Sequence, residues 1–419
     1  MYALDKYSMS AKQGNGKNKA IILICDGLGD RPSVGGRTPL QAADTSNIDK
    51  ISEEGINGLM DVISPGIVPG SDTAHLSLFG YDPHTYYPGR GVFEALGADM
   101  ELHKGEVAFR ANFATVDEKM RVVDRRAGRN GSKELASVLN GLEIDGVEIA
   151  LKNTTEHRCA LVMKGENISK YVSDVDSHEA GSIVQECKPL KEGEDALRTA
   201  AIVNKFVRMS HELLNEHPAN EARRQKGELP ANIILLRGAG SYEVVTPIKK
   251  RFGFSAACVA GASLYKGVAK YLGMDIIPVE GATGKADTNL NNKAEATLQS
   301  LEDHEFVFVH VKDTDNKGHD GNFEGKRNMI SRIDKELVAR LKDVDAYIVI
   351  TGDHSTPVPL KRHSSDPVPI VIKGEGIRKD NVKKFDEILA ASGGLNRIRG
   401  LDLMLTIADF MGYYKMYGT

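Results

Sequence analysis

Paired cysteines are the first thing that the sequence lacks: its four cysteines are scattered, and none forms a CxxC motif. This spacing argues against a disulfide framework and against a zinc site built on thiolates, and it suits a reducing cytosol. Long hydrophobic runs are also missing, because no apolar stretch approaches the roughly 18–20 residues that span a bilayer. Residues 1–19 contain no apolar segment of the signal-peptide type. We therefore expect a cytoplasmic protein.

An excess of charge of one sign is absent as well. The 54 Lys and Arg residues against 58 Asp and Glu residues give a net charge of −4, so nothing favours nucleic acid or an anionic membrane as a partner. Internal repeats and low-complexity tracts do not occur. The expected partner is a small molecule, and if it is anionic, local basic residues must attract it. The sequence leaves self-association open.

At 419 residues the chain is longer than one typical domain, and its pattern changes along its length. Near both ends, strand-like apolar runs alternate with helix-like segments, which predicts an α/β domain with a mostly parallel sheet covered on both faces. The middle has shorter apolar runs among Gly, Asn and charged residues. We predict a discontinuous metal-binding domain (residues 19–90 and 252–419), an inserted α+β substrate domain (residues 91–251) and a flexible N-terminal extension (residues 1–18).

Three strand-like segments each run into residues of the types that bind metals. Residues 19–25 (KAIILIC) are followed by Asp26, residues 306–311 (FVFVHV) by Asp315 and His319, and residues 346–350 (AYIVI) by Asp353, His354 and His363. Because ligands bind outside the carboxyl ends of parallel strands, three such ends can converge on one point. These carboxylates and imidazoles are enough for two divalent ions. They suit Mn²⁺ or Zn²⁺ and disfavour Ca²⁺, while Co²⁺ and Mg²⁺ stay open.

Each piece of this pattern also has a structural explanation. Position 26 begins an Asp-Gly pair, which is common in turns, and His363 alone resembles an ordinary loop histidine. Asp353 and His354 are stronger evidence, because adjacent ligand types at a strand end have little structural reason to occur. Asp315 and His319 are four residues apart around a glycine, a spacing that lets both point at one ion from a turn.

A fourth stretch, PGSDTAH, places Ser71 at the predicted start of a helix. Its structural explanation is a helix N-cap, for which a serine at this place is well suited. Both roles can hold, because the N–H groups at a helix N-terminus bind phosphate. A metal ion on the hydroxyl oxygen would lower its pKa and create an alkoxide nucleophile. The combined pattern predicts a metal-dependent phosphotransfer enzyme with Ser71 as nucleophile.

Several longer motifs match a known family. The segments ICDGLGDRP, PGSDTAHLSLFGYDP, GRGVFEALG, DNKGHDG and TGDHSTP resemble those of the cofactor-independent (2,3-bisphosphoglycerate-independent) phosphoglycerate mutases of archaeal type, within the alkaline phosphatase superfamily. The resemblance runs from about residue 19 to the C-terminus. It implies an alkaline-phosphatase-like three-layer domain, and the interconversion of 3-phosphoglycerate and 2-phosphoglycerate through phosphoserine without bisphosphoglycerate.

The resemblance also implies roles for individual residues. Ser71 would become the phosphoserine. The ligands implied for one ion are Asp26, Ser71, Asp353 and His354, and those implied for the other are Asp315, His319 and His363. All of these residues are present in this sequence, so the resemblance predicts a complete two-metal centre.

Basic residues for an anionic substrate lie mainly in the predicted insert. Guanidinium groups bind phosphate and carboxylate with two hydrogen bonds each, although a single arginine in such a loop is also typical of a solvated surface. The resemblance supports five residues on the substrate side of the site: Arg110, Asp124, Arg125, Arg237 and Lys266. Among them we choose Asp124 as the acid/base that shuttles the hydroxyl proton.

Other functions use the same residues. A phosphatase would replace the second substrate hydroxyl by water, and a phosphotransferase of the homoserine-kinase-like type would move phosphate to an amino-acid hydroxyl. Exclusion of water by a closing insert would separate the mutase from the phosphatase. A protein that only binds metal or phosphate would be expected to lack Ser71 or one ligand, and neither is missing.

Overall fold

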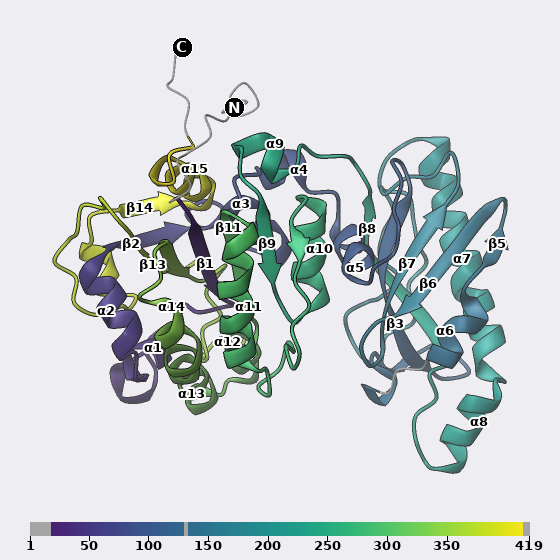
Figure 1. Ribbon diagram of the computed structural model, residues 1–419. Coiled ribbons are helices and arrows are strands. Elements are labelled where there is room, and N and C mark those ends of the chain that lie inside the picture. The colour runs from purple at the N-terminus through teal and green to yellow at the C-terminus, as the bar shows by residue number, and fades with distance from the viewer. Residues whose placement is uncertain (1–17, 130–132, 414–419) are drawn as a thin grey trace. The chain divides into compact units, whose positions relative to one another are not determined.

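The computed structural model describes residues 18–129 and 133–413, which form two compact units (Figure 1). The first unit contains the described residues up to Tyr87 and those from Val245 onward, and the second is Pro88–Val244. The second unit therefore begins three residues before the start of the predicted insert (91–251) and ends seven residues before the end of that insert. The predicted extension lies outside the described residues, apart from Asn18.

The first unit is built on an eight-stranded sheet with the order β10-β9-β11-β1-β12-β13-β2-β14. Its strands are β1 (Ala20–Cys25), β2 (Ile56–Asp61), β9 (Ala256–Val259), β10 (Asp275–Ile276), β11 (Phe306–Val311), β12 (Tyr347–Thr351), β13 (Val368–Lys373) and β14 (Asn396–Arg399). The five strands from β10 to β12 are parallel, and β13 alone runs against its two neighbours. Strand β1 lies between β11 and β12 and is parallel to both, so the three predicted strand ends meet at one edge of the sheet.

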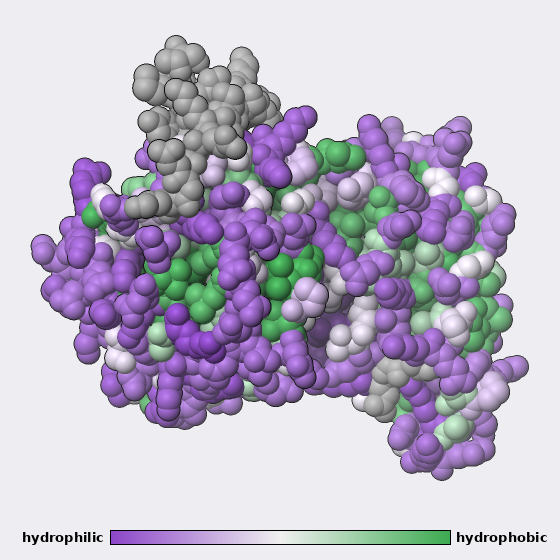
Figure 2. All heavy atoms as spheres, in the orientation of Figure 1, coloured by the Kyte–Doolittle hydropathy of each residue, from purple (hydrophilic) through white to green (hydrophobic). Residues whose placement is uncertain are grey.

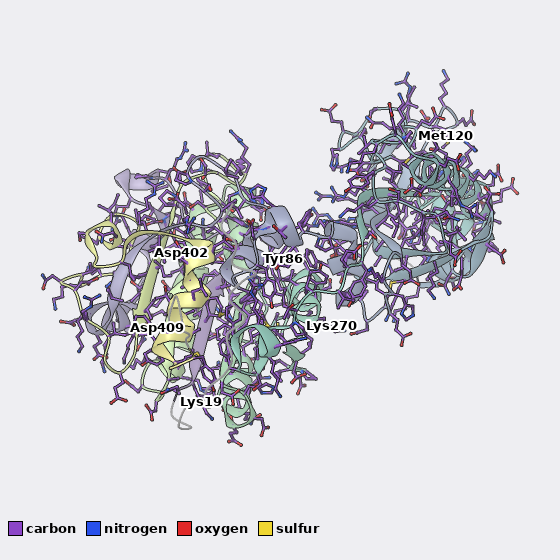
Figure 3. All side chains as sticks on the ribbon, turned by 90° about the horizontal axis from the view of Figure 1, so that it is seen from above. Lys19, Tyr86, Met120, Lys270, Asp402 and Asp409 are labelled. Atoms are coloured by element: carbon purple, nitrogen blue, oxygen red, sulfur yellow. The ribbon has the colours of Figure 1, made fainter. Side chains whose placement is uncertain are left out.

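Helices cover both faces of this sheet. The side chains of β1 alternate, so that Ile21 and Leu23 join one buried cluster with residues of α2 (Ser46–Glu54), α11 (Leu290–Asp303) and α13 (Phe323–Arg332). On the opposite face, α3 (Ser71–Leu78) contacts both α10 (Ser263–Tyr271) and α15 (Gly400–Phe410). Figure 3 shows Lys270 on α10, and Asp402 and Asp409 on α15. The predicted α/β class, with a mostly parallel sheet covered on both faces, is confirmed.

The helices of the first unit are mostly short. They are α1 (Pro39–Ala42), α2 (Ser46–Glu54), α3 (Ser71–Leu78), α4 (Pro83–Tyr86), α9 (Ile248–Phe252), α10 (Ser263–Tyr271), α11 (Leu290–Asp303), α12 (Asp313–Asp320), α13 (Phe323–Arg332), α14 (Ala339–Leu341) and α15 (Gly400–Phe410). A π-helical segment, Ile333–Val338, joins α13 to α14. Short 3-10 turns occur at Val34–Gly36 and Ala390–Ser392.

The second unit is an antiparallel α+β fold. Its six strands are β3 (Val107–Val116), β4 (Val122–Asp124), β5 (Leu142–Ile144), β6 (Val147–Asn153), β7 (Arg158–Lys164) and β8 (Ile233–Ser241), in the order β4-β3-β7-β6-β5 with β8 also paired to β3. Its helices are α5 (Arg90–Gly97), α6 (Lys133–Leu139), α7 (Glu194–Asn215) and α8 (Pro218–Gln225), with a 3-10 turn at Ala127–Arg129.

Hydrophilic side chains cover most of the face drawn in Figure 2, and hydrophobic ones show between them. Within the described ranges, no helix has both the length and the apolar character needed to cross a membrane.

Candidate metal and nucleophile site

The ends of β1, β11 and β12 bring acidic and histidine side chains together. Register pairs Cys25 with Val311 and Ile24 with Thr351, so the residues that follow these strands begin side by side. Asp26 follows β1 directly, α12 carries Asp315 after β11, and Asp353 and His354 follow β12. Parallel pairing of the three strands is therefore what collects these side chains from distant parts of the chain.

Asp26, Asp353 and His354 form the first group whose ligand atoms lie within 4.8 Å of one another. Nε2 of His354 is 3.3 Å from Oδ1 of Asp26 and 3.4 Å from Oδ2 of Asp353. These two carboxylate oxygens are buried, and neither has a hydrogen-bond partner among the described residues. Buried carboxylate oxygens without partners are costly, and a cation between them would remove that cost. The donor set fits a divalent metal ion.

The two carboxyl groups of this group have opposite pKa shifts. Burial, and then the negative charge of Asp26, raise the pKa of Asp353 well above its ordinary value. Burial would also raise the pKa of Asp26, but the ammonium of Lys312 and a hydrogen bond from His310 outweigh it and hold the pKa well below its ordinary value. Two carboxylates this close cannot both ionise without a compensating cation, which is what a metal ion supplies.

A second group shares His354 and adds Asp315 and His363, again with ligand atoms within 4.8 Å of one another. Nε2 of His363 lies 3.5 Å from Oδ1 of Asp315, and Nδ1 of His363 donates to the carbonyl of Pro69 at 2.8 Å. The His363 and His354 rings stack with centroids 3.7 Å apart. The loop histidine at 363 is thus oriented toward the acidic group by a backbone acceptor.

His319 differs from the predicted arrangement. Its Nε2 is 3.4 Å from Oδ1 of Asp315, but the side chain is 43% exposed and belongs to neither tight ligand group. Asp315 and His319 lie on the helix α12 rather than on a turn. The spacing of four brings them to one helix face, and Nδ1 of His319 donates to the carbonyl of Lys361 at 3.1 Å.

Ser71 is the first residue of α3, and Gly70 occupies the N-cap position. The N-cap explanation for Ser71 is therefore wrong. Its hydroxyl is 3.2 Å from Nε2 of His354, in a buried environment. The side chain thus contacts a residue that is common to both ligand groups, which suits a nucleophile activated at a metal centre.

Four further residues of this site were not predicted: Tyr265, His310, Lys312 and Thr356. Nζ of Lys312 lies 3.1 Å from Oδ2 of Asp26 and 2.6 Å from Oδ2 of Asp315, so that one ammonium forms ion pairs with both acidic residues. The hydroxyl of Tyr265 donates a hydrogen bond to Oδ2 of Asp26, and Nε2 of His310 donates to the same oxygen at 3.1 Å. A signal was present for His310, because it is a polar residue within the apolar run FVFVHV.

In the second unit, two predicted substrate residues face each other across strands. Arg110 on β3 pairs in register with Arg237 on β8, and like charges directly opposite each other are destabilising. Nε of Arg110 and Nε of Arg237 are buried, with no hydrogen-bond partner among the described residues. Burial lowers the pKa of Arg110 to about 9. Buried, partly unpartnered guanidinium groups of this kind fit an anionic ligand.

Arg125 and Asp124 already have protein partners. Arg125 forms two hydrogen bonds to the carboxylate of Asp176, of 2.9 and 2.7 Å. The carboxylate of Asp124 accepts from the backbone N–H groups of Arg126 and Gly128 at 2.9 and 2.8 Å. Asp124 and Arg125 line a cavity of about 530 Å³ together with Arg126 and Arg129. The fifth predicted residue, Lys266, belongs to the first unit and follows Tyr265 on α10.

Comparison with known sequences identifies full-length relatives. A profile of the family described as 2,3-bisphosphoglycerate-independent phosphoglycerate mutase matches residues 52–220. A protein of that name from Methanococcus aeolicus is 47% identical over 404 residues, which are 96% of this chain and 100% of the relative. Mutase 1 of Methanocaldococcus jannaschii is 48% identical over 408 residues, 96% of this chain and 99% of the relative.

Solved structures give the same result for the fold. A protein of Pyrococcus horikoshii matches with a TM-score of 0.83 and 39% identity, over 96% of this chain and 99% of its own. A protein of Thermoplasma acidophilum, described as a cofactor-independent phosphoglycerate mutase, matches with a TM-score of 0.70 and 37% identity, over 94% of this chain and 100% of its own. The likeness therefore covers both units.

Proposed function

This chain belongs to the family of 2,3-bisphosphoglycerate-independent phosphoglycerate mutases, and from this premise we propose how its residues interconvert 3-phosphoglycerate and 2-phosphoglycerate. The observation that carries the proposal is the contact of the Ser71 hydroxyl with His354, the residue shared by both ligand groups. This contact places the hydroxyl beside a residue that would help to hold an ion in either group. A phosphatase and a phosphotransferase, the two alternatives that the sequence left open, are less well supported, because the relatives at 47% and 48% identity are named as mutases.

Ser71 is the proposed nucleophile. Its Oγ, which has lost its proton to solvent before the cycle begins, attacks the phosphorus of 3-phosphoglycerate as an alkoxide; the bond from phosphorus to the 3-oxygen breaks, and the phosphoryl group is held on Ser71 while glycerate turns. The 2-hydroxyl then attacks the phosphoserine and releases Ser71 as the alkoxide with which the cycle began. Asp124 is proposed to give one proton to the departing 3-oxygen and to take one back from the 2-hydroxyl, which balances the exchange. No phosphate is gained or lost, so no bisphosphoglycerate primer is required.

We propose that Asp26, Asp353, His354 and Ser71 hold one divalent ion, and that Asp315, His363 and His319 hold the other. When bound, the ions lower the pKa of the Ser71 hydroxyl and neutralise charge on the transferring oxygens. Mn²⁺ is the proposed metal, because mixed carboxylate and imidazole donors suit it. The Lys312 ammonium adds a fixed positive charge beside both groups.

We further propose that Arg110, Arg125 and Arg237, together with Lys266, bind the anionic groups of phosphoglycerate. The Nε atoms of Arg110 and Arg237, which have no hydrogen-bond partner among the described residues, support this role. Arg125 is held in place by Asp176 and would use its remaining N–H groups. The four cysteines are free and buried, which fits the proposed cytoplasmic location.

Phosphorus NMR of the purified protein with 3-phosphoglycerate and Mn²⁺, without bisphosphoglycerate, tests this proposal. The expected result is a 2-phosphoglycerate signal that disappears on chelation and in Ser71→Ala. Ser77→Ala is the matched control, because it removes another buried hydroxyl of α3, one bonded to the carbonyl of Val62, and it should keep activity. Inorganic phosphate alone would instead identify a phosphatase. Absence of turnover would favour the phosphotransferase and call for a screen of acceptor alcohols.

A further inference from the structure

Thr356 connects the two ligand groups through a single hydroxyl. The residue is completely buried and lies two positions after His354. Its Oγ1 is 2.6 Å from Oδ1 of Asp315 and 3.1 Å from Nδ1 of His354. Asp315 belongs to one ligand group and His354 to both. A shift of this hydroxyl would therefore disturb both groups at once.

The direction of the two hydrogen bonds follows from the chemistry of the partners. The carboxylate of Asp315 accepts hydrogen bonds and is already paired with the ammonium of Lys312 at 2.6 Å. Hydrogen bonds to charged acceptors are the stronger ones, so the O–H of Thr356 donates to Asp315. Its oxygen is then left as the acceptor for an N–H at Nδ1 of His354. The proton of neutral His354 is thereby placed on Nδ1.

This assignment leaves Nε2 of His354 with a free lone pair. Nε2 is the atom that lies 3.2 Å from the hydroxyl of Ser71 and 3.3 Å from Oδ1 of Asp26. A histidine binds a metal ion through an unprotonated nitrogen, and the hydrogen bond made by the other nitrogen selects which one that is. Thr356 thus orients the imidazole and selects its coordinating atom.

The backbone of Thr356 is itself held from two sides. Its N–H donates to the carbonyl of Gly29 at 3.1 Å. Its carbonyl accepts from the buried ammonium of Lys326 at 3.0 Å, and the same ammonium binds Asp30 at 2.8 Å. The Lys326 and Asp30 side chains are fully buried. The threonine is consequently fixed by the fold and does not depend on the metal ions for its position.

Two glycines leave room for the Thr356 side chain. A Cβ added at Gly27 would lie 2.5 Å from Oγ1 of Thr356, and one added at Gly318 would lie 2.8 Å from its Cγ2. Both distances are shorter than a van der Waals contact, so a larger residue at either place would force the threonine to move. Close packing therefore leaves the hydroxyl in one position, between Asp315 and His354.

We propose that Thr356 is a positioning residue that fixes the His354 tautomer and couples the two metal sites. The inference rests on the proposed function for the identity of the sites as metal sites. It concerns the protein before substrate binds, so its test uses metal binding and histidine tautomers, and mutase turnover is measured separately.

The first test is a ¹⁵N NMR measurement of histidine tautomers in the metal-free protein. Wild type should show His354 protonated at Nδ1, with the signal assigned by its loss in His354→Gln. Thr356→Val, which removes only the hydroxyl, should mix the two tautomers, and Thr356→Ser should restore the wild-type signal. Protonation of His354 at Nε2 in wild type would overturn the inference, and this holds even if the valine variant does not fold.

The second test is calorimetric titration of the metal-free proteins with Mn²⁺ alone. Substitution of a residue that holds a metal ligand in place typically lowers metal affinity by about 10–100-fold. Thr356→Val should lower the affinity for both ions by that order, whereas Thr356→Ser should keep an affinity near that of wild type. Weakening of one ion only, or of neither, would refute the coupling. Two ions bound by a wild type that has no mutase activity would count against the proposed function and leave this inference standing.

Discussion

At the scale of single residues, three buried carboxylates share one ammonium. Asp26, Asp315 and Asp353 are almost completely buried. Lys312 contacts Asp26 and Asp315 directly. Its charge also lowers the pKa of Asp353, but burial raises that pKa by more. In the metal-free protein, Lys312 is therefore the main positive charge that balances the centre. When metal ions are bound, the same charge is partly redundant for stability.

This arrangement predicts that Lys312→Met destabilises the metal-free protein far more than the loaded one. Breaking a buried ion pair typically costs about 3–5 kcal/mol, and most of that cost should disappear when divalent ions compensate the carboxylates. Urea unfolding with EDTA and with Mn²⁺ measures both values. The matched control is Lys317→Met on α12, the helix that Lys312 precedes, because the Lys317 ammonium is 3.8 Å from its acidic partner Asp313. Equal losses of stability with and without metal would contradict the prediction.

Glu387 is a titratable group away from the metal ligands. Burial raises its pKa from 4.5 to about 7, while its carboxylate accepts from the N–H of Asp30 at 3.1 Å and from the hydroxyl of Thr38 at 2.8 Å. The raised pKa means that the folded state disfavours the charged form. The contribution of Glu387 to stability is therefore complete below pH 4.5 and is lost as the pH rises through 7.

We expect Glu387→Gln to lose this pH dependence. Between pH 5 and pH 8 the free energy of unfolding of the Glu387→Gln variant should rise relative to that of wild type by about 2 kcal/mol. This figure takes about 1.36 kcal/mol per pKa unit and is reduced because the side chain is partly exposed to solvent. Urea unfolding at several pH values measures the difference between the two proteins, in which the titration of all other groups cancels. A difference that does not vary with pH would show that Glu387 ionises freely in the folded protein.

At the scale of elements, α12 explains why a glycine stands between Asp315 and His319. The sequence suggested a turn, but the segment is helical and Gly318 packs against residue 356. A Cβ at this place would lie 2.4 Å from the carbonyl oxygen of Thr356. The glycine is thus required by the close approach of α12 to the loop after β12, and not by a left-handed backbone conformation.

Gly318→Ala should consequently lower stability, although Ala is favoured over Gly in a helix by about 1 kcal/mol. The clash with a backbone oxygen should also displace Thr356 and weaken metal binding. Thermal unfolding and Mn²⁺ titration measure the two effects. Asp320→Ala is the control on the same helix, because Asp320 is exposed, and it should change neither property by much. A more stable Gly318→Ala protein with normal metal affinity would show that the loop can move aside.

The elements that sequence predicts well are those defined by a local pattern. The run FVFVHV coincides with β11, because a segment of this length that is apolar apart from one histidine suits a strand buried on both faces. Between α13 and α14 the structure has the π-helical segment Ile333–Val338, which was not predicted. The 22-residue helix α7 was largely missed, because Thr199, Ala200 and Ser210 lie on its buried side and weaken the hydrophobic contrast.

At the scale of the whole molecule, sequence order hides which residues become neighbours. Asp26 and His354 were predicted as ligands from strand ends. That His354 belongs to both ligand groups, that Thr356 contacts Asp315 and that Lys312 contacts Asp26 depends on pairs of residues far apart in the chain, 41 positions for Thr356–Asp315 and 286 for Lys312–Asp26. Such contacts have no local signature. The predicted ligand types could be read from the sequence, but the way they are joined required the fold.

The two units also have separate hydrophobic clusters. One cluster is built from β3, β7 and β8 with α7, and the other from β1, β11 and β12 with α11 and α13. Both ligand groups lie in the first unit. Metal binding stabilises only the part of a protein whose unfolding releases the ion, by about 2.7 kcal/mol at a metal concentration of 100 times Kd.

Chelation should therefore raise amide hydrogen exchange in the first unit and leave the second unit nearly unchanged. We expect the largest increase at the ends of β1, β11 and β12, because their carboxylates lose the ions that offset mutual repulsion. Exchange in β3 and β7 should stay as in the loaded protein. Mass spectrometry of peptides with Mn²⁺ and with EDTA measures this, and Asp353→Asn provides a variant in which EDTA should have less effect on the first unit. Equal changes in both units would mean that metal binding is coupled to the core of the insert, and that the two clusters unfold together.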